Sequence, residues 1–227
     1  MGEIIIALNT YEKNQALEWV SRFKDRVKIF KIGLPLFSHY GLEIVKEIRE
    51  QEVEIFLDMK LHDIPSVVED SIRALRDLDI KYVTIHLTGG KSMISGALSA
   101  ADDKIEIIGV TILTSIDDKM LSELMGEDLK VKNTVVKLVD LFLNLGGKNI
   151  VLSGHEAKLI KDRFPDVKVF VPGIRFAEDE KGDQARVVTP AFARENGFDF
   201  IVVGRSITHA KDPDKALNRL IEEFYGT

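Results

Sequence analysis

The chain of 227 residues contains no cysteine, so it offers no disulfide framework, no thiolate nucleophile and no zinc–thiolate site. It also lacks any apolar run near the roughly 20 residues that a membrane-spanning helix needs. Its first residues have neither the basic flank nor the small-residue cleavage site of an export signal. We therefore expect a cytoplasmic protein without a membrane partner.

Positive charge is in deficit as well. Lys and Arg number 31 against 37 Asp and Glu, which gives a net charge of −6. This balance disfavours the positive field that nucleic-acid binding requires, so we expect no polymeric nucleic acid as a partner. Small anions remain compatible, because a few arginines and backbone N–H groups can form a local positive pocket.

Short apolar runs alternate with amphipathic segments along the whole chain, and no low-complexity tract or composition break divides it. The runs predict eight strands, at residues 4–9, 27–33, 53–60, 82–87, 105–113, 149–153, 167–174 and 200–204. The amphipathic segments predict helices at 14–23, 42–51, 67–78, 91–101, 134–145, 156–163, 190–196 and 213–224.

Strands that are apolar on both faces and separated by helices are typical of a parallel sheet that helices cover. Eight such units predict closure into a single (β/α)₈ barrel domain over residues 1–227, with an open doubly wound sheet as the alternative. The longest connections, 115–133 and 175–189, follow strand ends, where barrel active sites are built.

Charged residues interrupt two neighbouring apolar strands. Lys31 lies in one, and Asp58 and Lys60 end the next. Because Asp58 and Lys60 are two positions apart, alternation places them on the same face. The three groups could be a salt-bridge network that only satisfies buried charges, or the charged centre of an active site. A further acid, Asp63, precedes Pro65, and could be the N-cap of the next helix.

Residues 58–65, Asp-Met-Lys-Leu-His-Asp-Ile-Pro, closely resemble the signature of the orotidine 5′-phosphate decarboxylase family. The resemblance extends along nearly the whole chain, through the segments 7–8, 31–33, 86–90, 113–115, 171–175 and 202–208 in the family's order and spacing.

The resemblance implies decarboxylation of orotidine 5′-monophosphate to uridine 5′-monophosphate, in de novo pyrimidine synthesis, without a cofactor or metal. It implies an array of Lys31, Asp58 and Lys60, which Asp63 from a second subunit completes in a homodimer. The aspartates would disfavour the bound substrate carboxylate, and Lys60 would stabilise and protonate the carbanion.

Phosphate recognition is expected where the last two strands end. Arg175 follows one strand and Gly204 and Arg205 follow the other, and glycine with arginine suits close contact with phosphate. Gln184 matches the family's phosphate and base contact on a loop that closes over the ligand. The resemblance also implies substrate contacts from Ile64, Pro65, Ser66 and Thr114, together with Asn9, Lys31, Asp58 and Val67.

Two positions depart from the family pattern. Asn9 stands where the family usually has an aspartate that holds a ribose hydroxyl, and Val67 stands where a threonine is common. An amide accepts a weaker hydrogen bond than a carboxylate, so sugar affinity should fall while the lysine–aspartate array stays intact. Asn9 could be natural or engineered.

Two other functions remain open. Metal-dependent sugar-phosphate decarboxylases and synthases on the same barrel share the Asp-x-Lys-x-x-Asp core, but place an acid where this chain has Lys31. A catalytically silent nucleotide-binding barrel is the second alternative. His86, at a strand end, is expected to support the site rather than to bind metal, since the remaining histidines are scattered.

Overall fold

The computed structural model describes residues 2–126, 128–179 and 187–227. Its parallel strands pair in sequence order, and β8 pairs with β1, so the sheet closes into a barrel. The strands are β1 (Glu3–Leu8), β2 (Ile29–Gly33), β3 (Glu54–Leu61), β4 (Tyr82–His86), β5 (Glu106–Val110), β6 (Asn149–Val151), β7 (Lys168–Pro172) and β8 (Phe200–Val203). The predicted (β/α)₈ barrel is confirmed, and the open sheet is wrong.

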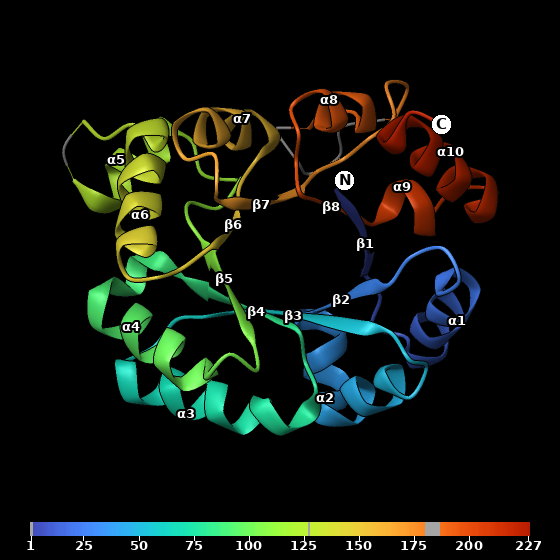
Figure 1. Ribbon diagram of the computed structural model, residues 1–227, viewed down its shortest axis with the longest axis horizontal. Coiled ribbons are helices and arrows are strands. Elements are labelled where there is room, and N and C mark those ends of the chain that lie inside the picture. The colour runs from blue at the N-terminus through green and yellow to red at the C-terminus, as the bar shows by residue number, and fades with distance from the viewer. Residues whose placement is uncertain (1, 127, 180–186) are drawn as a thin grey trace.

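The helices surround this ring of strands on the outside (Figure 1). They are α1 (Lys13–Phe23), α2 (Leu34–Arg49), α3 (Pro65–Leu75), α4 (Gly90–Ala101), α5 (Asp118–Met125), α6 (Val131–Asn144), α7 (Gly154–Arg163), α8 (Pro190–Glu195), α9 (Arg205–Thr208) and α10 (Pro213–Tyr225), with short 3₁₀ turns at Arg76–Leu78 and Leu87–Gly89. No helix within the described ranges has both the length and the apolar character to cross a bilayer.

Helices α5 and α9 were not predicted from the sequence, and α2 begins earlier than predicted. The connection 115–133 contains α5, whose N-cap Asp117 accepts a hydrogen bond from the Met120 N–H. Helix α2 begins at Leu34 rather than at residue 42, with a kink at Gly41, where φ is 55°. A positive φ is readily adopted by glycine, so the chain bends there and resumes its helical turn.

The barrel interior is filled with apolar side chains at the level where most strands begin. Phe170 and Phe200 stack with ring centroids 4.1 Å apart, and Tyr82 packs edge-on against both. Burial raises the pKa of Tyr82 above its usual range. The residues of this inner cluster are Ile5, Ala7, Ile29, Phe56, Tyr82, Ile108, Phe170, Phe200 and Val202. Open space inside the barrel is therefore found at the other end, where the strands finish.

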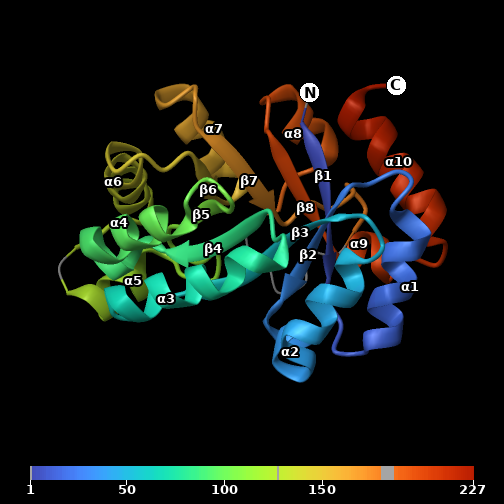
Figure 2. The ribbon, with the colours of Figure 1, turned by 60° about the horizontal axis from the view of Figure 1, so that its bottom comes forward.

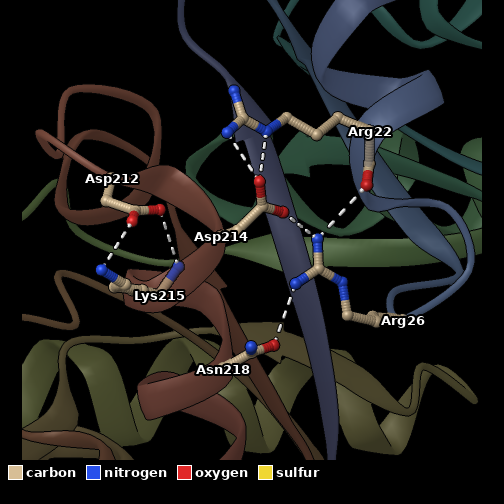
Figure 3. Close-up of polar contacts among 6 residues, drawn as sticks. All are labelled: Arg22, Arg26, Asp212, Asp214, Lys215 and Asn218. Atoms are coloured by element: carbon tan, nitrogen blue, oxygen red, sulfur yellow. Dashed lines mark hydrogen bonds and ion pairs between the residues drawn. The ribbon is translucent and has the colours of Figure 1, made fainter.

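Polar contacts between α1 and α10 connect the first and last helices (Figure 3). Asp214 lies between Arg22 and Arg26, which both form ion pairs with it, and Arg26 also donates to Asn218. Both chain ends lie at the top of Figure 2, the end at which β1 begins. The candidate site lies at the opposite end.

Candidate active site at the carboxyl ends of the strands

A carboxylate on β3 lies between two ammonium groups, one on β2 and one further along β3. Lys31 is the central residue of β2, and its Nζ is 3.1 Å from Asp58 Oδ2. Lys60, further along β3, donates from Nζ to Asp58 Oδ1 at 2.7 Å. The structure thus brings together the three charges that the sequence singled out.

Burial sets the electrostatics of this group. The side chains of Lys31 and Asp58 are each 13% exposed and that of Lys60 is 32% exposed. Burial by itself raises the pKa of Asp58, but the charges of Lys31 and Lys60 outweigh it and lower the pKa to about 2. Asp58 is therefore ionised at neutral pH, as a fixed negative charge between two positive ones.

Strand β3 is irregular where it carries Lys60. Its pairing with β4 passes from Leu57 opposite Val83 to Leu61 opposite Ile85, so β3 advances four residues while β4 advances two. Lys60 has φ of 49°, a left-handed conformation that is uncommon for a residue with a side chain. Simple alternation along the strand predicted that Asp58 and Lys60 share a face. Their contact is confirmed, but the irregular part of β3, not regular alternation, brings the two side chains together.

Thr84 also contacts the array and was not predicted from the sequence. Thr84 on β4 is fully buried, and its hydroxyl donates to Asp58 Oδ1 at 3.0 Å and accepts from the Lys60 N–H at 2.8 Å. Threonine is common in strands, so a threonine in an apolar strand does not by itself indicate a functional site. The only signal was its position two residues before His86, on the strand face that leads to the barrel mouth.

The array lies on the wall of a cavity of about 290 Å³ at the barrel mouth. The predicted site residues that line it are Asn9, Lys31, Asp58, Lys60, Thr114, Arg175, Gly204 and Arg205. Leu152 and Ser153, after β6, also line it and were not predicted. Because Phe56 and Val202 of the inner cluster line it too, filled barrel core lies directly below the cavity.

Two arginines line this cavity from the ends of β7 and β8. Arg175 is 9% exposed, and its Nη1 donates to the Ile174 carbonyl at 2.8 Å. A Cβ at Gly204 would lie 2.6 Å from Asn9 Nδ2, so a larger residue there would displace the Asn9 side chain. The two guanidinium groups give this wall a positive charge suited to an anion. The predicted contact Gln184 lies outside the described residues.

The start of α3 is placed away from this cavity. Asp63 is exposed, and its Oδ1 accepts from the Ile64 N–H at 2.7 Å. Ile64 is the N-cap of α3, and no side chain caps it, so the alternative that Asp63 caps this helix is wrong. The other predicted contacts of this segment, Pro65, Ser66 and Val67, do not line the cavity of their own chain either. Ile64 and Val67 are 63% and 44% exposed.

His86 ends β4 beside the array. Its ring centroid is 5.3 Å from that of His62. Burial, followed by the nearby His62 and Lys60, lowers the pKa of His86, so its ring is favoured in the neutral form. Among the described residues, no group of three or more His, Asp or Glu side chains could hold a metal ion.

Known proteins similar to this chain identify its family. The model of the Orotidine 5′-phosphate decarboxylase / HUMPS family matches residues 2–220. Orotidine 5′-phosphate decarboxylase of Wolbachia pipientis subsp. Culex pipiens is 38% identical over 226 residues, covering 99% of both chains. The enzyme of the same name from Buchnera aphidicola subsp. Schizaphis graminum is 39% identical over 98% of this chain and 95% of its own.

A solved structure agrees with these sequence relatives. The crystal structure of Orotidine 5′-phosphate decarboxylase from Lactobacillus acidophilus superposes with a TM-score of 0.86 at 31% identity, over 99% of both chains. The matches cover the barrel from β1 into α10, and therefore all the strand ends that form the cavity. The chain belongs to the Orotidine 5′-phosphate decarboxylase / HUMPS family.

Proposed function

We propose that this protein decarboxylates orotidine 5′-monophosphate to uridine 5′-monophosphate without a cofactor. The observation that carries the proposal is the position of Asp58 between Lys31 and Lys60 on the wall of a cavity that Arg175 and Arg205 also line. One cavity thus offers a lysine–aspartate array and cations for a phosphate. The relatives named above carry this activity in their names.

The chemistry would proceed at the array. The bond between the pyrimidine ring and its carboxylate breaks, carbon dioxide leaves, and the electron pair stays on the ring carbon. Ionised Asp58 would disfavour the bound substrate carboxylate, while the ammonium of Lys60 stabilises the carbanion and donates the proton that forms the new C–H bond. Lys31 would keep Asp58 in place and ionised.

The phosphate would bind at the opposite wall, at the guanidinium groups of Arg175 and Arg205 and the backbone beside Gly204. Binding a phosphate that takes no part in the reaction can align the ring with the array, so these contacts should raise turnover as well as affinity. Thr114 would contact the nucleotide beside them, and Gln184 would close over it. Asn9 would accept a hydrogen bond from the ribose.

A second subunit would complete each site. Asp63 is too exposed to serve its own cavity, and the exposed apolar side chains of Ile64 and Val67 beside it suit burial against another copy. We include in this proposal a homodimer in which Asp63, with the segment 64–67, reaches the partner's substrate. Each subunit of such a two-fold pair gives one Asp63 and receives one.

Mixing two inactive variants tests the shared site. Lys60→Ala and Asp63→Ala dimers should each be inactive, but random exchange should give about a quarter of sites with both residues intact. Activity should therefore rise well above both parents. No recovery, despite heterodimers verified by native mass spectrometry, would show that Asp63 does not act across subunits.

The metal-dependent sugar-phosphate alternative fits this site less well. Both oxygens of Asp58 are already bound by Lys31 and Lys60, so a cation would have to displace two ammonium groups. A spectrophotometric assay of orotidine 5′-monophosphate loss, with a chelator present and no cofactor added, separates the alternatives. We expect full activity with the chelator; loss of activity would favour the metal enzyme.

The same assay separates an enzyme from a silent nucleotide-binding barrel. Binding of the nucleotide by calorimetry, with no loss of substrate over hours, would identify the silent barrel. Turnover would place the protein at the last step of de novo uridine monophosphate synthesis, and the cytoplasm is its proposed location.

A further inference from the structure

Thr84 is a buried polar residue that the proposed reaction does not yet use. Its side chain is completely buried on β4, and its hydroxyl bridges the two residues on which the chemistry depends. It accepts a hydrogen bond from the backbone N–H of Lys60 at 2.8 Å and donates one to Asp58 Oδ1 at 3.0 Å. Both hydrogen-bonding functions of the hydroxyl are therefore used.

The β3 bulge explains why a side chain is needed here. Regular pairing stops at Leu57 and resumes at Leu61, so Lys60 falls where β3 and β4 are out of register. Thr84 lies on β4 between the paired residues Val83 and Ile85, directly across from the bulge. Its hydroxyl gives the Lys60 N–H a bond in place of the interrupted pairing, since a buried N–H without a partner is costly.

We propose that Thr84 is a positioning residue for the decarboxylation, which holds Lys60 in its left-handed conformation and fixes the orientation of the Asp58 carboxylate. The proposal rests on the proposed function. A positive φ at a lysine is unfavourable and persists only where its surroundings maintain it. The Thr84 bond to the Lys60 N–H is such a constraint.

The bond to Asp58 has a separate effect. Oδ1 of Asp58 accepts from both Lys60 Nζ and the Thr84 hydroxyl, while Oδ2 faces Lys31. A carboxylate held at both oxygens cannot rotate away when the substrate carboxylate arrives beside it. The repulsion between Asp58 and the substrate carboxylate is then preserved, and Lys60 Nζ stays directed at the ring carbon that it protonates. Loss of the hydroxyl should therefore lower kcat and leave KM nearly unchanged.

Three variants test this role in the full-length protein. Thr84→Val keeps the shape but removes the hydroxyl, and Thr84→Ser keeps the hydroxyl but removes a methyl group. Thr111→Val is the matched control, because Thr111 is 1% exposed and its Oγ1 has no hydrogen-bond partner among the described residues. Thermal unfolding of each variant shows that it is folded before turnover of orotidine 5′-monophosphate is measured.

We expect Thr84→Val to lower kcat by about 10- to 100-fold with KM within about 3-fold, as expected for a lost hydrogen bond to a charged group. Thr84→Ser should retain kcat within about 3-fold, and Thr111→Val should match the wild type. The proposal is overturned if Thr84→Val keeps its kcat, or if Thr84→Ser loses as much as Thr84→Val.

Hydrogen exchange at the Lys60 amide of the wild-type protein gives a measurement that requires no variant to fold. Protection of this amide supports the bond to Thr84, and exchange at the rate of an exposed amide overturns it. This measurement also separates the two proposals. Wild-type protein that fails to turn over orotidine 5′-monophosphate refutes the proposed function, whereas the exchange rate still decides whether Thr84 holds Lys60.

Discussion

Two aspartates in this molecule each lie between two cations, in very different surroundings. Asp58 lies between Lys31 and Lys60 inside the barrel mouth, with 13% of its side chain exposed. Asp214 lies between Arg22 and Arg26 on the outer surface, where α10 meets α1, with 41% of its side chain exposed (Figure 3).

The pKa of both carboxyl groups is lowered, for different reasons. At Asp214 the hydrogen bonds from Arg22 and Arg26 lower it, and solvent surrounds the group. At Asp58 burial opposes ionisation, and the charges of the two lysines lower the pKa to about 2. The comparison teaches that the same arrangement of charges is structural where water screens it and can serve catalysis where water is excluded.

Removing one neighbouring cation of each aspartate should give the largest difference in turnover between the two regions. Lys60→Ala should lower turnover by about 1,000-fold or more while product analogues still bind, because the proposed proton donor is lost. Arg22→Ala, the matched loss beside Asp214, should leave turnover unchanged. Steady-state kinetics with product binding by calorimetry measures both, and near-normal turnover in Lys60→Ala would remove the assignment of the donor.

An added acid at the cavity should give the next largest effect. Asn9 lines the cavity close to Gly204, and Asn9→Asp would place there a carboxylate directed at the substrate ribose rather than at a lysine. We expect kcat/KM to improve by about 10- to 100-fold, for a hydrogen bond worth roughly 1.5–3 kcal/mol to a charged group. An unchanged or lower kcat/KM would show that the chain compensates for Asn9 elsewhere.

The sequence predicted the barrel and the charged array because both follow from local patterns. Apolar strands alternate with amphipathic helices, and Lys31, Asp58 and Lys60 interrupt apolar strands where charge is costly. The role of Thr84 could not be predicted in this way. It depends on the β3 bulge, a register shift between two strands that leaves no periodic signal in either one.

Helix α5 and the start of α3 show a second limit to what the sequence predicts. Helix α5 has only 8 residues, which is shorter than the window of about 11 residues over which helical periodicity is normally recognised. Asp63 was assigned from family resemblance, and a single chain places it outside the cavity. The proposed contact of Asp63 with a second subunit therefore rests on the resemblance, because no local pattern in the sequence indicates a contact between chains.

Acid should weaken the stabilising contribution of Asp58. Its folded pKa of about 2 lies below the ordinary value of 3.8, so ionised Asp58 favours the folded state by roughly 2 kcal/mol above pH 3.8. That contribution is lost as pH falls from about 4 towards 2. Urea unfolding of wild type and Asp58→Asn should therefore show a stability difference that shrinks as pH falls from about 4 to about 2. A difference that stays constant would contradict this.

The smallest effect is expected at Asp214, where solvent should screen the charges. Asp214→Asn should leave turnover unchanged and lower Tm by less than about 3 °C, because exposed ion pairs contribute little to stability. Even this difference should shrink in about 0.5 M NaCl, because salt screens exposed charges. The difference caused by Asp58→Asn should persist in the same salt, since buried charges are screened much less. If Asp214→Asn lowered Tm as much as Asp58→Asn, burial would not be what separates the two aspartates. The contacts of α1 with α10 would then hold the first and last units of the barrel together.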